Sequence, residues 1–93
     1  MKHIYIEDIL NNAAISGRIT KKVKDAVAEL FSIYRKRLLN ILGYIPEEFV
    51  FLENLKEYNR LDVMNTCKNY DFIKKNIDDF IKKNIDDGSE RFL

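Results

Sequence analysis

The amino-acid sequence predicts an all-α protein, a compact bundle of three to four helices with a long second helix as its spine. Apolar residues recur with the helical period of 3.6 in four segments, at about 6–15, 20–42, 46–59 and 62–87. The glycines and the one proline fall at the ends of these segments. The chain of 93 residues is expected to form a single domain, 1–93, with a radius of gyration of about 12 Å.

The first two segments each carry one apolar face and a glycine at the end. In 6–15, Gly17 follows at the position where a left-handed residue commonly ends a helix. In 20–42, Thr20 is the expected N-cap and Gly43 the expected end. This second helix should span ~34 Å at 1.5 Å per residue. Its apolar face, an arc of ~80°, comprises Val23, Val27, Leu30, Tyr34, Leu38 and Ile41.

The third segment, 46–59, opens with a proline that suits the first turn of a helix. The run 49–52 is apolar in every direction, so a short strand is the alternative to a helix there. The same run is either an internal core element or a contact in a homodimer. A helix is favoured because it places three residues on one face: Phe51, Leu55 and Tyr58.

The fourth segment, 62–87, has Asp62 as its expected N-cap and Gly88 as its expected end, with 88–93 as a frayed tail. Eight residues, Phe-Ile-Lys-Lys-Asn-Ile-Asp-Asp, occur twice in succession, at 72–79 and 80–87. Eight residues turn a helix about 80° beyond two full turns, so the copied apolar face drifts. We interpret the repeat as a lengthened solvated helix, and a partner-docking helix is the alternative. The predicted apolar stripe comprises Val63, Cys67, Tyr70, Ile73, Ile77, Ile81 and Ile85.

The sequence contains no signal-peptide core and no stretch near the roughly 18–20 apolar residues that cross a bilayer. We therefore expect a cytoplasmic protein without membrane contact, in which Cys67 stays reduced as a small core residue. One Cys and one His cannot build a disulfide framework or a histidine-based zinc site. No metal, cofactor or catalytic residue is predicted.

Charge is distributed unevenly along the chain. Residues 1–42 hold eight basic and four acidic groups, a net of +4, whereas 43–93 hold eight basic and eleven acidic groups, a net of −3. The cations cluster at the start of the second predicted helix, where the helix dipole also favours an anion, and again about 21 Å along it. The predicted binding residues are Arg18, Lys21, Lys22, Lys24, Arg35, Lys36 and Arg37.

These cations lead to the functional hypothesis. We predict a small, non-enzymatic, intracellular binding protein that occludes a macromolecular partner through a basic helical face. A regulatory subunit, an inhibitor or a virus-encoded effector fits this description, and the expected partner is a protein with an acidic surface. Sequence-independent binding of nucleic acid through the same cations is the alternative function. In the remaining alternative, these cations form an ordinary solvent-exposed helix face that binds no partner.

One short motif resembles an enzyme family. Residues 57–63, Glu-Tyr-Asn-Arg-Leu-Asp-Val, are similar to the last motif of the DnaQ-like 3′–5′ exonucleases. The resemblance implies that Tyr58 orients an attacking water and that Asp62 binds a catalytic metal ion. That family also needs an Asp-x-Glu pair on a strand and a second Asp, which this chain does not show in context. Two-metal hydrolysis cannot run on one ligand, so Asp62 is interpreted as a helix cap and no enzyme is predicted.

Overall fold

The computed structural model describes residues 2–90, and nearly all of them are helical. The α-helices are α1 (Lys2–Ser16), α2 (Lys21–Leu42) and α3 (Arg60–Glu90). Two 3₁₀ segments, η1 (Glu47–Glu53) and η2 (Leu55–Glu57), connect α2 to α3. No strand occurs within the described range 2–90. The predicted all-α bundle is confirmed, and the strand alternative for 49–52 is wrong.

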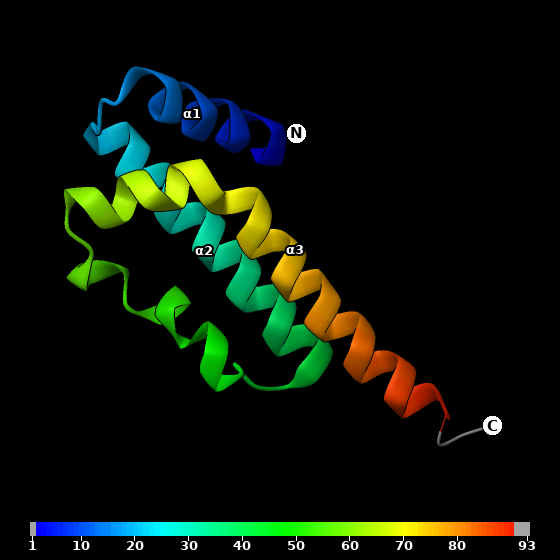
Figure 1. Ribbon diagram of the computed structural model, residues 1–93. Helices are drawn as coiled ribbons and strands as arrows, with labels where there is room; N and C mark the ends of the chain where they lie inside the picture. Colours follow the sequence, from blue (N-terminus) through cyan, green and yellow to red (C-terminus); the bar gives the residue numbers. More distant parts are fainter. Residues whose placement is uncertain (1, 91–93) are drawn as a thin grey trace.

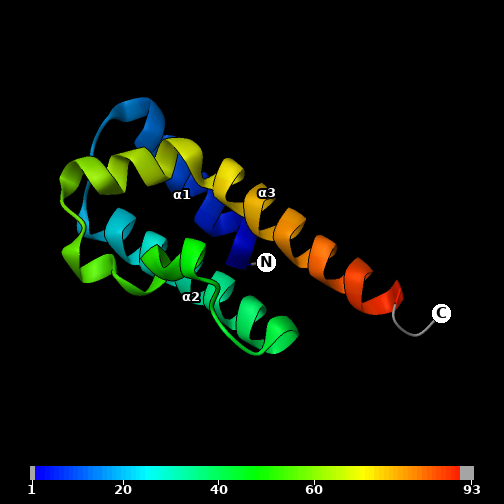
Figure 2. The ribbon, with the colours of Figure 1, turned by 60° about the horizontal axis from the view of Figure 1, so that its bottom comes forward.

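Helix α2 is the spine of the bundle and contacts α1, α3 and η1. A short turn folds α1 back onto the first half of α2, while α3 runs beside α2 in the same direction (Figures 1 and 2). The molecule measures 50 × 26 × 18 Å and has a radius of gyration of 14.6 Å. This radius exceeds the expected value of about 12 Å because α3, with 31 residues, is about 46 Å long.

The ends of α1 and α2 lie where local sequence signals predict them. The Thr20 side chain accepts a hydrogen bond from the Val23 amide at 3.3 Å, which caps the start of α2. Gly17 and Gly43 end the two helices with φ angles of 75° and 84°. Each of these glycines donates its N–H to the carbonyl four residues earlier, at 2.8 and 2.9 Å. All three residues therefore act as predicted.

The ends of α3 differ from the prediction. Asn59 precedes the helix, and its Oδ1 accepts a hydrogen bond from the Asp62 amide at 2.9 Å. The Asp62 carboxylate in turn accepts one from the Asn59 amide at 3.0 Å, which completes a reciprocal capping box. The assignment of Asp62 as the N-cap is therefore wrong, because Asn59 takes that place. The helix also continues past Gly88, and residues 91–93 of the predicted tail lie outside the described residues.

The segment 46–59 does not form the predicted α-helix but the two 3₁₀ segments. Four of its large side chains are spaced by three residues, which is the period of a 3₁₀-helix: Phe49, Leu52, Leu55 and Tyr58. Phe49 and Leu52 are buried, and the other two are half-buried. Phe49 and Leu52 of this run therefore belong to the core, whereas Val50 is 44% exposed.

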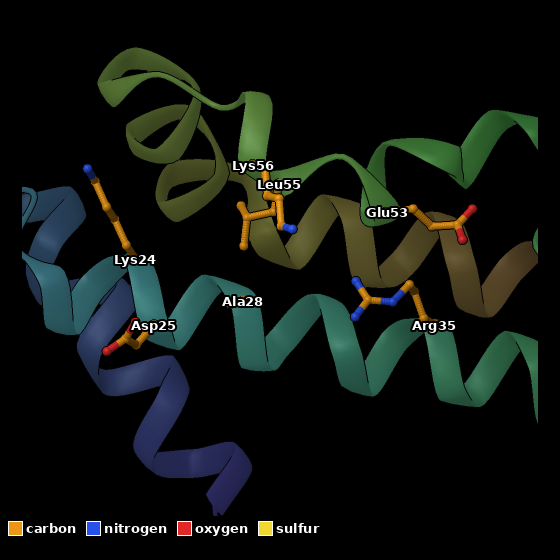
Figure 3. A pocket seen from close by; sticks show the side chains of 7 residues that line it. All are labelled: Lys24, Asp25, Ala28, Arg35, Glu53, Leu55 and Lys56. Atoms are coloured by element: carbon orange, nitrogen blue, oxygen red, sulfur yellow. The ribbon is translucent and has the colours of Figure 1, made fainter.

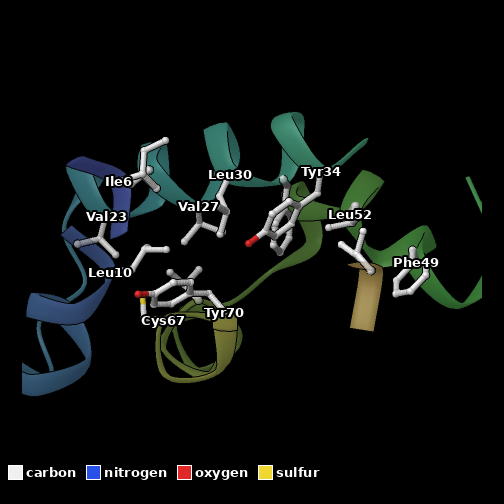
Figure 4. Close-up of a cluster of buried hydrophobic side chains, with 14 of the residues drawn as sticks. Ile6, Leu10, Val23, Val27, Leu30, Tyr34, Phe49, Leu52, Cys67 and Tyr70 are labelled. Carbon is white, nitrogen blue, oxygen red and sulfur yellow. The ribbon is translucent and has the colours of Figure 1, made fainter. Parts of the chain in front are cut away.

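The core is continuous from α1 to η1, with side chains of all three α-helices facing one another (Figure 4). Phe31 of α2 lies at its centre and is fully buried. Its ring makes edge-on contacts with Phe51 and Tyr58 at centroid distances of 5.9 and 5.8 Å. Cys67 is 1% exposed, in agreement with its predicted role as a core residue. The 3₁₀ segments are therefore held to α2 by aromatic packing.

The two copies of the eight-residue repeat occupy different environments. Ile77 of the first copy is fully buried, whereas its equivalent Ile85 is 47% exposed. Phe72 is 64% exposed, but its equivalent Phe80 packs edge-on against Phe49 at 5.5 Å. The rotation of about 80° per copy explains the difference. Ile41 and Ile85 were expected on the buried stripes and are exposed, because the shorter α1 does not reach this end of the bundle.

Identical residues at equivalent positions of the repeat should contribute unequally to stability. We expect Ile77→Ala to lower the free energy of unfolding by about 3 kcal/mol, since it leaves a cavity in the core. Ile85→Ala should lower it by less than about 1 kcal/mol. Urea unfolding followed by circular dichroism measures both. Equal losses would contradict the environments described for the two copies.

Candidate binding site

The predicted cations of α2 do not share one face. Arg35 and Arg37 are two residues apart and therefore point about 200° apart around the helix. The Arg35 Nη1 donates a hydrogen bond to the carbonyl of Leu52 in η1. Arg37 forms an ion pair with Asp78 of α3. Arg35 thus holds η1 against α2, and the Asp78 carboxylate compensates the charge of Arg37.

The remaining predicted cations are also divided among surfaces. Lys22 lies over the ring of Tyr5 in α1, with its Nζ 5.4 Å from the ring centroid. Arg18 lies in the turn before α2 and lines a hollow together with Lys22. Lys21 and Lys36 are exposed. A second pair, Lys24 and Arg35, lines a larger cleft on the side of the 3₁₀ segments (Figure 3).

This cleft lies between α2 and the 3₁₀ segments and has a volume of about 610 Å³. We call it the α2–η2 cleft. The small side chain of Ala28 leaves the space open on the α2 side, and Leu55 forms an apolar wall opposite. The lining residues are Lys24, Asp25, Ala28, Arg35, Glu53, Leu55 and Lys56.

Two cationic groups converge on the α2–η2 cleft. The Arg35 guanidinium and the Lys56 ammonium reach into the space between α2 and η2 (Figure 3). The carboxylates of Asp25 and Glu53 point away from its middle. Because the Leu52 carbonyl takes one donor of Arg35, the guanidinium is oriented and still has further N–H groups to offer. The arrangement can hold an anionic group next to an apolar one.

The sequence alone did not single out Lys56. It lies outside both basic clusters, in a segment where Glu53 and Glu57 are its charged neighbours. Its partner Arg35 is 21 positions earlier in the chain, and no local spacing relates the two residues. The core packing of η1 and η2 on α2 is what brings them together.

Tyr58 and Asp62, which carry the resemblance to exonucleases, have structural contacts. The Tyr58 ring packs on Phe31, and burial together with nearby Asp62 raises the pKa of its hydroxyl. The Asp62 carboxylate is engaged in the capping box with Asn59. Among the residues that the structure describes, no three His, Cys, Asp or Glu side chains are grouped closely enough to hold a metal ion. Asp62 thus has a structural role as the partner of Asn59 in the capping box, in place of the expected role as the N-cap itself.

Three buried side chains of the core, Tyr34, Cys67 and Tyr70, have raised pKa values. Burial raises the pKa of the Cys67 thiol above its ordinary value, so the thiol is protonated at neutral pH. Burial is also the main cause that raises the pKa of Tyr34 and of Tyr70. The Tyr70 hydroxyl donates a hydrogen bond to Asn11 of α1 at 3.2 Å. These groups stabilise the bundle in their neutral forms.

No protein-family model matches the chain, and neither a curated protein nor a solved structure shows significant similarity to it. None of the helices, over the residues described, combines the length and the apolar character needed to span a bilayer.

The capping box predicts a measurable stability effect at Asp62. We expect Asp62→Ala to lower the free energy of unfolding by about 1 kcal/mol, since the Asn59 amide loses its acceptor. Asp62→Asn should cost less, because an amide oxygen can still accept this bond. Urea unfolding provides the measurement, with Asp71→Ala, an exposed carboxylate later in α3, as the control. An unchanged stability of Asp62→Ala would contradict the capping role.

The raised pKa of the buried tyrosines predicts alkaline destabilisation. A group whose folded pKa lies above its unfolded value holds its proton more tightly in the folded state. Its stabilising contribution is therefore complete below the ordinary tyrosine pKa of 10.0 and is lost as the pH rises above it. The melting temperature should fall as the pH rises from about 10 to about 12, and Tyr34→Phe should reduce that fall. A pH-independent melting temperature over this range would refute the expectation.

Proposed function

We propose that the protein is a binding module whose α2–η2 cleft receives an acidic segment of a partner protein. The observation that carries this proposal is the convergence of Arg35 and Lys56 over a small apolar floor. A carboxylate of the partner fits between the two cations, and an adjacent apolar side chain fits against Ala28 and Leu55. Charge-assisted hydrogen bonds then set the orientation, and apolar contact adds affinity.

The Arg35 side chain is prepared for this role before a partner arrives. Its bond to the Leu52 carbonyl restricts a long side chain that would otherwise lose rotamer freedom on binding. Its planar guanidinium also suits a carboxylate better than a point charge does. A partner therefore meets an ordered cation on one side of the cleft and the flexible Lys56 on the other.

The rims of the α2–η2 cleft favour a protein over a nucleic acid. Asp25 and Glu53 lie at the edges of the cleft, where they would repel a continuous phosphate backbone. A peptide with spaced carboxylates avoids them. Occlusion of the bound segment is the proposed mechanism, and a regulatory subunit or an inhibitor would act in this way.

A charge reversal at Lys56 tests the proposal. Peptides selected from a phage-displayed library on the immobilised protein should be acidic. Their affinity, measured by fluorescence anisotropy, should fall about tenfold or more in Lys56→Glu because the carboxylate then meets a like charge. Lys75→Glu is the matched control: it makes the same change of charge on an exposed part of α3 and should bind as the wild type does.

Two results would contradict the proposed function. The first is a selection that enriches peptides without acidic residues, or peptides that Lys56→Glu and Lys75→Glu bind equally. The second is tight binding of duplex DNA that weakens steeply with salt, which would favour the nucleic-acid function instead.

A further inference from the structure

Two chain turns meet at one end of the bundle, where the turn between α1 and α2 lies beside the start of α3 (Figures 1 and 2). This end exposes aliphatic side chains: Ile15 is 87% and Leu61 is 66% exposed. Leu61 also lines a shallow hollow of about 360 Å³, together with Gly17, Ile19, Arg60 and Met64. We call this region the end surface, and it comprises Ile15, Gly17, Arg18, Ile19, Lys21, Arg60, Leu61 and Met64.

Positive charge surrounds these aliphatic side chains. Residues 15–24 hold four cations and no acidic residue, while 56–64 hold two cations and two acidic residues, one of which is the capping Asp62. Helices α2 and α3 both begin here, so two positive dipole ends add to this charge. The segment that follows α2 differs, since residues 40–53 hold three acidic residues and no cation, and Lys83 of α3 lines a hollow with Glu48 there.

We propose that the end surface binds the anionic face of a lipid bilayer. Ile15 and Leu61 insert at the boundary between headgroups and acyl chains, and Arg18, Lys21 and Arg60 lie against headgroup phosphates. The anionic lipid attracts the cations of the end surface, so the elongated molecule stands with this surface toward the bilayer. This inference does not rest on the α2–η2 cleft. It also departs from the sequence-based expectation of no membrane contact.

A bilayer suits this surface better than a protein partner for two reasons. The end surface comprises eight residues, whereas a stable protein interface uses roughly 20–30 residues on each side. Its most exposed member, Ile15, projects from the surface and has few neighbours of its own chain around it. A protein partner would need a matching pocket for such a side chain. A fluid lipid boundary accommodates a projecting side chain without shape complementarity.

Cosedimentation of the full chain with lipid vesicles tests the proposal. The wild type should bind vesicles of equal parts phosphatidylcholine and phosphatidylserine, and should stay free with phosphatidylcholine alone. The double variant Ile15→Ser/Leu61→Ser and the double variant Arg18→Glu/Arg60→Glu should each lower the partition coefficient about tenfold or more. The matched control for charge, Lys74→Glu/Lys75→Glu, makes the same change of net charge on exposed cations of α3 and should bind as the wild type does, as should Phe72→Ser, which changes an exposed apolar side chain there.

Unchanged circular dichroism and melting temperature establish that each variant is folded, which is expected because every substituted side chain is exposed. Absence of wild-type binding to the anionic vesicles would overturn the proposal. An equal loss in the control would also overturn it, since the effect would then reflect net charge alone. Loss of affinity for the selected peptides in Ile15→Ser/Leu61→Ser, without vesicle binding, would assign the end surface to a protein contact. Peptide binding by the cleft is measured without lipid, so either proposal can fail separately.

Discussion

Burial of the apolar side of α2 against three neighbours is the constraint on which the rest of the structure depends. Val27, Phe31 and Leu38 lose all solvent exposure, although no single neighbour could cover them. Each such side chain contributes roughly 1.5–3 kcal/mol when it is fully buried, so α1, α3 and η1 all gain by staying on α2. Phe31 in addition sets the position of the 3₁₀ segments through its edge-on contacts with Phe51 and Tyr58.

The α2–η2 cleft is a consequence of this packing. Arg35 lies one turn after Phe31 on the side of α2 that faces η1, and there its guanidinium meets the Leu52 carbonyl. The same packing brings Lys56 opposite the small Ala28. The hydrophobic core and the cationic site are therefore coupled. A change that loosens the aromatic contacts would also displace the two cations.

Helix α3 shows how a repeated sequence acquires different roles. The two copies of the eight-residue motif differ by about 80° around the helix, so each meets a different neighbour. The first copy places Ile77 in the core and Asp78 against Arg37 of α2. The second copy places Phe80 against Phe49, whereas Ile85 of the same copy is exposed to solvent. Position along the bundle, rather than residue type, decides what each copy does.

The sequence by itself determined the helical class, the bounds of α2 and the ends marked by Thr20, Gly17 and Gly43. These features depend on hydrogen bonds and apolar spacing within about four residues, so they can be inferred without the fold. Two lining residues of the α2–η2 cleft, Lys24 and Arg35, were among the cations that the sequence predicted as binding residues, because each belongs to a cluster of cations close together in the chain.

The tertiary structure alone decided the 3₁₀ path of residues 47–57, the separation of Arg35 from Arg37, and the placement of Lys56 and Arg35 around one cleft. It also brought Ile15 and Leu61, 46 positions apart in the chain, to one end of the bundle. Each of these features depends on contacts with side chains that are far away in the sequence. The residue pattern of one segment does not predict which distant segment will pack against it.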